Sequence, residues 1–251
     1  GSVLRCDEGQ SLSAIWGAVG SAELVKPMIA RSCRLVETQE EAATLSLVDT
    51  FAEQDALEAL LEKAKPPVPT SANGLHYLLS TPFRYPPLPH GSRFGRRSES
   101  GILYASITAE TCLAEVAYYR FVFLHDIEAP PPNPVITQHT LFWFKAHHNR
   151  GVDLTDPVFH SFSDTLTHCS SYIGTQELGS ELRRQEVSLI RYSSARCPEA
   201  GHNVAVLSPQ AIKSRAPEDI VAISCMTRES RVFFQGDIRA EFSLSDFLDG
   251  G

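Results

Sequence analysis

Short apolar runs separated by prolines and glycines fill the chain from Leu75 onward. These runs are rich in β-branched and aromatic residues, which favours strands. They read LHYLLS, GILYAS, VITQHTLFWFK, VSLIRYSS, NVAVLS, DIVAISCM and RVFFQGD. Two segments have a helical pattern, about Thr108–His125 and about Ser171–Glu186. Strands and helices do not alternate regularly and no G-x-G-x-x-G motif occurs, so a Rossmann fold is disfavoured. We predict an α+β domain over residues 71–251, with a mixed β core and flanking helices.

The upstream part of the chain has a different pattern. Between residues 37 and 65, apolar positions such as Leu45, Val48 and Leu57 recur with helical spacing, and glutamates occupy the other face. The segment Pro66-Pro67-Val68-Pro69 then ends the helical pattern. We predict that residues 1–70 form a helical N-terminal extension.

Composition narrows the class of protein. The chain has 251 residues and a formal net charge of −8, so it lacks the basic surface that direct nucleic-acid binding requires. It contains neither an apolar run of about 20 residues nor a secretory signal, which predicts a cytoplasmic protein without membrane spans. The six cysteines are scattered, without C-x-x-C or H-E-x-x-H spacing. We expect reduced thiols and no metal.

One carboxylate stands out in the segment TAETCLAEVAYYRFVFLH. Thr108 is a good N-cap, and from Cys112 to Tyr119 every residue except Glu115 is apolar or aromatic. A helix that is apolar nearly all round is buried, and its embedded carboxylate requires a cation or a ligand. The residues alone leave two interpretations open, a Glu–Arg ion pair in the core and a functional glutamate.

Arginines gather ahead of this helix, in the stretches FRYPP and HGSRFGRR. They are Arg84, Arg93, Arg96 and Arg97, with glycines and aromatic residues among them. Guanidinium groups match phosphate oxygens in pairs, and glycines let the backbone approach an anion. In an acidic protein this local excess favours a pocket for an anionic ligand. The alternative, a solvated basic loop, suits Arg96 and Arg97 best.

A third group of polar residues, RYSSAR and then GHN, lies between two apolar strands. Functional residues often occupy such strand ends, although an ordinary polar hairpin has the same pattern. No nucleophile elbow or Ser/His/Asp order is present, so a general hydrolase is disfavoured.

Taken together, PFRYPPLPHGSRFG, GILYASITAETCLAEVAYYR and LIRYSSAR resemble the RES domain, over about Leu75 to Phe234. The name records a characteristic arginine, glutamate and serine. The resemblance implies the toxin half of a bacterial RES–Xre toxin–antitoxin module, with a fold similar to ADP-ribosyltransferase toxins.

The matching motifs assign the arginines, tyrosines and glutamate of the family to positions in this sequence. Arg84 and Arg93 match its two arginines, and Tyr85 follows the first. Tyr104 and Glu115 match the tyrosine and the glutamate eleven positions apart. By resemblance the arginines hold the pyrophosphate of NAD⁺, the tyrosines border the nicotinamide, and Glu115 stabilises the charge that develops on the ribose.

The serine has more than one candidate. Ser194, at the end of RYSSAR, fits best, with Ser193 beside it. Some RES proteins place it in the segment that here reads SSYIGTQELG, where Ser171 or Thr175 is the nearest match. The expected catalytic set is Glu115, Arg84, Arg93, Tyr104 and Ser194; the expected NAD⁺-binding set is Arg84, Tyr85, Arg93, Tyr104, Ser193 and Thr175.

The implied activity is cleavage of the nicotinamide–ribose bond of NAD⁺, by phosphorolysis or hydrolysis, which depletes cellular NAD⁺. NAD⁺ is the substrate, phosphate is the co-substrate of the phosphorolysis route, and no cofactor is expected. The implied partner is an Xre/ParS-like antitoxin, with a homo-oligomer within that complex as a further expectation. Two alternatives stay open, an ADP-ribosyltransferase that modifies a protein and a non-catalytic NAD-binding module.

Overall fold

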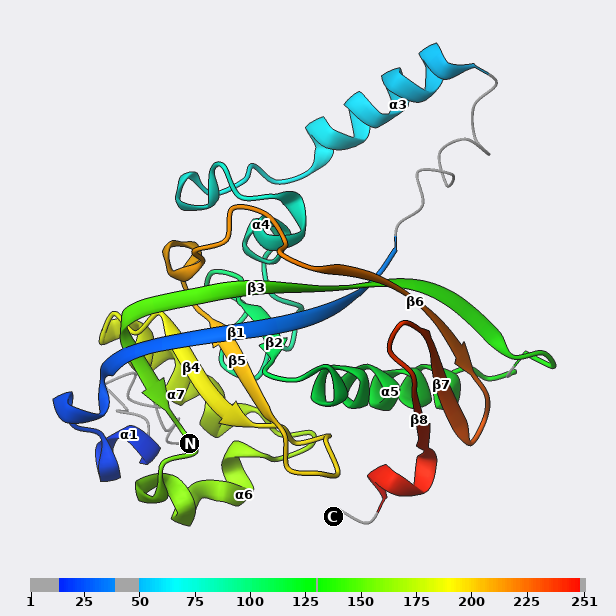
Figure 1. Cartoon of the computed structure of the whole chain (residues 1–251). Helices are drawn as coiled ribbons and strands as arrows, with labels where there is room; N and C mark the ends of the chain where they lie inside the picture. The colour runs from blue at the N-terminus through cyan, green and yellow to red at the C-terminus, as the bar shows by residue number, and fades with distance from the viewer. Residues whose placement is uncertain (1–13, 39–49, 130, 249–251) are drawn as a thin grey trace, which may run out of the picture.

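A mixed eight-stranded sheet with helices around it forms the fold, which confirms the predicted α+β class (Figure 1). The computed structural model describes residues 14–38, 50–129 and 131–248. The strand order is β1-β2-β5-β4-β3-β6-β7-β8, with a further pairing of β1 to β3. The strands are β1 (Lys26–Glu37), β2 (Leu103–Ser106), β3 (Val135–Asp153), β4 (Leu189–Ser193), β5 (His202–Val206), β6 (Ile220–Thr227), β7 (Arg231–Gly236) and β8 (Ala240–Ser243).

The α-helices within the described residues range from one turn to nearly five. They are α1 (Ala14–Val19), α3 (Phe51–Ala64), α4 (Tyr77–Arg84), α5 (Ala109–His125), α6 (Ser163–Leu166) and α7 (Ile173–Arg184). Figure 1 shows α5 running alongside β1 and β3, whereas α3 stands away from the sheet. The helices predicted at 108–125 and 171–186 are thus confirmed as α5 and α7.

The long strand β3 organises the sheet. Its first half pairs with β6, most of its length pairs with β1, and its last three residues pair in parallel with β4. The pairings β1-β2-β5-β4-β3-β1 therefore close on themselves. As a result the ends of three short strands meet at one place, where Ser106 of β2 and Tyr192 of β4 both face Asn203 of β5.

Helix α5 begins directly after β2 and passes beside these strand ends. The Thr108 side chain caps it by accepting a hydrogen bond from the Thr111 N–H at 3.2 Å. Its inward face, which includes Leu113 and Ala117, is fully buried against the sheet. Gly201 lets the β4–β5 turn approach the helix, because a Cβ there would lie 2.0 Å from Thr111 Oγ1. This close approach brings β5 next to the first turns of α5.

The prediction that residues 1–70 form a helical extension is wrong for residues 26–37. Residues 26–37 form β1, which is paired to β3 along its length and belongs to the sheet. Its buried positions include Ala30, Cys33 and Leu35, but charged residues between them mask the strand pattern. Of the segment predicted to be helical over 37–65, residues 51–64 are observed as α3 and Glu37 ends β1. Residues 39–49 lie outside the described residues.

Most of the strands predicted downstream are confirmed as β2 to β7. The run LHYLLS is an exception, because it enters helix α4, where Leu79 and Phe83 are buried one turn apart. An apolar run this short does not distinguish a strand from a helix. Strand β8 was not predicted.

No helix within the described residues is long and apolar enough to cross a membrane. Cys33, Cys112 and Cys225 are buried free thiols, Cys197 is half-buried and Cys169 is exposed. No group of three or more potential metal ligands is found in that same part of the chain.

Candidate active site

Glu115 projects from α5 and is held by uncharged partners. Its Oε1 accepts hydrogen bonds from Ser194 Oγ at 2.6 Å and from Asn203 Nδ2 at 2.7 Å. None of the ion pairs among residues 14–38, 50–129 and 131–248 includes Glu115. The half-buried carboxylate is therefore not the anionic half of a core Glu–Arg pair, and Oε2 accepts no hydrogen bond from the described residues.

Ser194 lies just past the end of β4 and is buried. Its Oγ accepts hydrogen bonds from the main-chain N–H groups of Arg196, at 3.1 Å, and Cys197, at 3.0 Å. These two donors occupy the oxygen lone pairs, so the hydroxyl proton points to Glu115. A hydroxyl fixed in this way forms a charge-assisted hydrogen bond with an ionised carboxylate.

Asn203 and Ser106 complete the support of the carboxylate. Ser106 Oγ donates to Asn203 Oδ1 at 2.7 Å, and both side chains are buried. Neither was among the expected site residues, although GHN was recognised as a polar strand end. The missing signal is the register of β2 and β5, which places the two side chains opposite each other.

Arg93 lies in the loop between α4 and β2 and forms no ion pair with a carboxylate of the described residues. Its Nη1 donates to the carbonyl oxygens of Leu166, at 2.8 Å, and His168, at 3.2 Å. The guanidinium carbon lies 4.9 Å from the centroid of the Tyr172 ring. Nε and Nη2 donate to no described residue, so this part of the cation remains available to an anion.

Tyr104 fixes the turn that carries Arg93. Its hydroxyl is hydrogen-bonded to Ser92 Oγ at 2.8 Å and accepts from the Phe94 N–H at 3.0 Å. Burial raises the pKa of Tyr104, so the phenol stays protonated at neutral pH. The expected site residue Tyr104 thus shapes the loop with its hydroxyl, while its ring is partly buried.

Tyr192 joins the arginine and the glutamate electrostatically. Burial, followed by the charge of Glu115, raises the pKa of Tyr192 well above its ordinary value, while the Arg93 guanidinium opposes the shift. Its ring packs edge-on against Phe94 with centroids 4.9 Å apart. Tyr192 also lies opposite Asn203, which donates to Glu115, and its Phe94 neighbour follows Arg93 in the chain. We call this group of residues the glutamate cluster.

Two further tyrosines surround this cluster. Burial, together with the neighbouring phenol of Tyr172, raises the pKa of Tyr119 to about 12, and the charge of Glu115 acts in the same direction. Tyr172 also lies beneath Arg93. Tyrosine rings thus lie near both the Glu115 carboxylate and the Arg93 guanidinium.

Arg84 and Tyr85 lie elsewhere. Arg84 forms an ion pair with Glu62 of α3 at 2.7 Å and donates from Nε to the Pro66 carbonyl. None of its contacts reaches the glutamate cluster. Tyr85 ends α4 and is exposed. The structure thus brings Glu115, Ser194, Arg93 and Tyr104 together and ties Arg84 to α3.

The remaining serine and threonine candidates differ in their surroundings. Ser193 is the last residue of β4, opposite His202. Thr175 is fully buried, and its hydroxyl donates to the Tyr172 carbonyl at 3.1 Å within α7. Ser171 is exposed, and its main-chain N–H donates to His168 Nδ1. Of these hydroxyls, only that of Ser194 bonds Glu115.

Arg196 is a buried arginine that sequence reasoning left out of the site. Its guanidinium lies 3.8 Å from the centroid of the Tyr118 ring and donates to the Cys169 carbonyl. Nε and Nη1 are buried without a hydrogen-bond partner among the described residues. It helps to attach the segment at Cys169 to the turn that carries Ser194.

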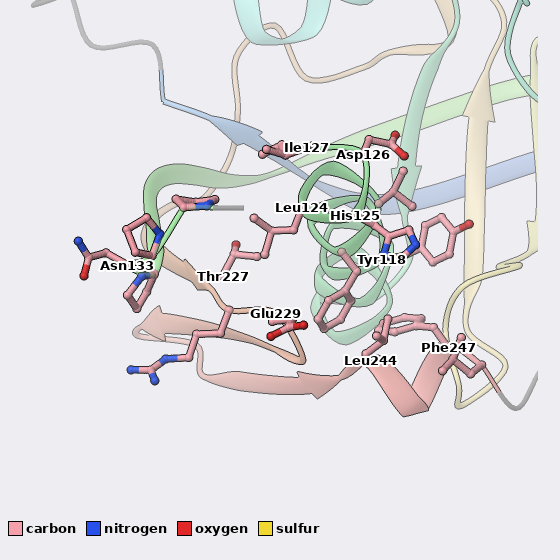
Figure 2. Close-up of a pocket in the computed structure, with 17 residues that line it drawn as sticks. Tyr118, Leu124, His125, Asp126, Ile127, Asn133, Thr227, Glu229, Leu244 and Phe247 are labelled. Carbon is pink, nitrogen blue, oxygen red and sulfur yellow. The ribbon is translucent and has the colours of Figure 1, made fainter. Parts of the chain in front are cut away.

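A pocket of about 810 Å³ lies around the C-terminal half of α5 (Figure 2). Its wall combines that helix with the proline-rich segment, the β6–β7 turn and the C-terminal residues; labelled members include Tyr118, His125, Asn133, Glu229 and Phe247. Glu115, Ser194 and Asn203 do not line it. The hydrogen-bonded carboxylate is thus outside this pocket.

Comparison with known proteins identifies the class. The sequence profile of the RES domain matches residues 68–226, more than half of the chain. The chain therefore belongs to the RES domain family, which confirms the resemblance found in its motifs. Among solved structures it is similar to a chain in "Crystal structure of the M.tuberculosis MbcT-MbcA toxin-antitoxin complex", with 11% identity, 90% of each chain covered and a TM-score of 0.43. Comparison with curated proteins gave no match.

Proposed function

We propose that this protein is a toxin-type enzyme that cleaves the nicotinamide–ribose bond of NAD⁺. The supporting observation is the state of Glu115, a carboxylate held by two neutral donors, with no cationic partner among the described residues and with Oε2 unoccupied. A carboxylate that is oriented but not neutralised can stabilise positive charge on a sugar ring. The substrate class is inferred from membership of the RES family, since the resemblance of the motifs implies NAD⁺ as the substrate.

The proposed chemistry balances without a cofactor. The bond between C1″ of the ribose and the pyridinium nitrogen breaks, and its electron pair stays on the nitrogen, so neutral nicotinamide leaves. The ribose acquires oxocarbenium character, which Glu115 stabilises. An oxygen of water or phosphate then bonds to C1″, giving ADP-ribose or ADP-ribose-1″-phosphate, and the proton from water passes to solvent.

The other roles follow from position. Arg93 contributes Nε and Nη2 to the pyrophosphate, while Nη1 stays bonded to the 166–168 segment. Tyr104 and Tyr192 border the nicotinamide, and Ser194 holds Glu115. For four residues the binding roles that the resemblance implies have less support, because their contacts lie outside the cluster. These residues are Arg84, Tyr85, Ser193 and Thr175.

The biological setting is also a proposal. An antitoxin of the Xre/ParS-like kind would restrain the enzyme in the cytoplasm, and release would deplete NAD⁺. A non-catalytic NAD-binding module is less well supported, because it rests on Glu115 as a core ion pair. The alternative is an ADP-ribosyltransferase, in which the same bond is cleaved but a protein accepts the ADP-ribose.

The test incubates purified protein with NAD⁺, with and without inorganic phosphate, and measures nicotinamide and the ribosyl product by chromatography. We expect nicotinamide release by wild type and its loss in Glu115→Gln. NAD⁺ that stays intact with wild-type protein would contradict the proposal. Radiolabel from NAD⁺ that enters a protein band would instead identify the transferase.

A further inference from the structure

Two polar side chains lie inside the sheet where β2 pairs with β5. Ser106 and Asn203 are partners in the antiparallel register, and each is only 4% exposed. Their neighbours in these strands, Ala105 and Val204, are buried and apolar. Buried polar groups destabilise a fold unless they are hydrogen-bonded, so this pair needs its partners.

The hydrogen bonds of the pair run in one direction. The Ser106 hydroxyl donates to Asn203 Oδ1, and Asn203 Nδ2 donates to Glu115 Oε1, each at 2.7 Å. A carboxylate has no proton to donate when ionised, so only the N–H side of the amide can face it. Rotating the amide by half a turn would set Oδ1 against Oε1. The serine therefore stabilises the orientation that the glutamate requires.

As a consequence, the two oxygens of the Glu115 carboxylate accept different numbers of hydrogen bonds. Ser194 and Asn203 both donate to Oε1, whereas Oε2 receives no hydrogen bond from the described residues. The two donors approach from different strands, β5 and the end of β4, and so fix the rotation of the side chain.

We propose that Asn203, oriented by Ser106, is the positioning residue that fixes the rotation of the Glu115 carboxylate and turns Oε2 toward the ribose. The inference rests on the proposed role of Glu115 and adds the device that supports it. Asn203 acts through Glu115, so its loss affects turnover more than substrate binding.

The kinetic test compares Asn203→Ala, Asn203→Asp and Ser106→Ala with wild type at one pH. Asn203→Ala removes a hydrogen bond that orients the carboxylate, so we expect kcat to fall about 10- to 100-fold and KM to change little. Asn203→Asp should lower kcat further, since it sets a second carboxylate against Glu115.

The serine has a matched control. Ser32 of β1 is fully buried in the same sheet, and its hydroxyl has no hydrogen-bond partner in the described residues. Ser106→Ala should lower kcat about 3- to 10-fold, whereas Ser32→Ala should not change it. In the Asn203→Ala background, Ser106→Ala should lower kcat little further, because both changes remove the same support. Additive effects of the two changes, or a rise in KM as large as the fall in kcat, would mean a purely structural role and would overturn the proposal.

A second measurement does not depend on activity. Crystal structures of wild type and of the Asn203→Ala and Ser106→Ala proteins show the rotation of the Glu115 carboxylate directly. We expect the carboxylate to be rotated, or to occupy more than one rotamer, in both variants. If wild type leaves NAD⁺ intact but this change is seen, the proposed function fails and the positioning device stands. If the carboxylate keeps its wild-type rotation in folded variants, the device is refuted whatever the activity.

Discussion

Two carboxylates on helices that cover the sheet have opposite surroundings. Glu181 of α7 is 3% exposed, and Arg184 Nη2 and Gln185 Nε2 donate to its two oxygens at 2.6 and 3.1 Å. Glu115 of α5 is less buried and has neutral donors on one oxygen only. The more deeply buried glutamate has a cation and complete hydrogen bonding, whereas the more accessible one has neither.

This difference separates a structural group from a candidate functional one. Burial of a charge is tolerated when a partner compensates it, and removing the partner then destabilises the fold. A charge that is incompletely compensated lowers the stability of the fold. Enzymes retain such groups where the substrate supplies the missing contact. Arg84 with Glu62 belongs to the first kind, and Arg93 belongs to the second.

The largest expected effect comes from neutralising the two carboxylates separately. Glu115→Gln should lower NAD⁺ cleavage about 1000-fold or more, because it removes charge stabilisation from the transition state. Its thermal unfolding should change little, since the Gln oxygen still accepts from Ser194 and Asn203. Glu181→Gln should keep activity and lose about 1–2 kcal/mol of unfolding free energy. Activity assays and thermal denaturation of both proteins measure this.

The opposite pattern would break the comparison. If Glu115→Gln unfolded at much lower temperature while Glu181→Gln lost activity, the completeness of hydrogen bonding would not mark function in this fold.

The arginines give the next effect in size. Arg93→Ala should raise KM for NAD⁺ about 10- to 100-fold, because it removes the cation proposed to bind phosphate. Arg84→Ala should change KM and kcat less than threefold, since its cation is bound to Glu62 and Pro66. Steady-state kinetics at fixed ionic strength distinguish the two. A larger effect at Arg84 would restore it as the pyrophosphate ligand implied by the family motifs.

The sequence predicted those parts of the fold that depend on local pattern. Helix α5 follows from its N-cap Thr108 and its apolar residues, and Glu115 stands out because it interrupts them. Strand β1 was missed because its burial comes from β3, more than a hundred residues later, and not from its own alternation. The short run in α4 was misassigned because it fits either period.

The site followed the same rule. Glu115, Arg93 and Ser194 belong to motifs that can be recognised along the chain. Asn203 and Ser106 lie in ordinary polar strand ends, and only the pairing of β2 with β5 and the approach of α5 give them a role. The register between strands that are far apart in the chain determines which side chains support a site residue. A single sequence carries no local signal of that register.

The smallest expected effect distinguishes the two tyrosines of the cluster. The Tyr104 hydroxyl has two partners, Ser92 and the Phe94 N–H, whereas that of Tyr192 has none among the described residues. Tyr104→Phe should therefore cost about 1 kcal/mol of stability, because it leaves those partners unsatisfied. Tyr192→Phe should leave stability unchanged and lower kcat about threefold, because its hydroxyl lies within the fields of Glu115 and Arg93. Denaturant unfolding with parallel kinetics measures both, and equal stability losses would show that the Tyr192 hydroxyl also has a structural role.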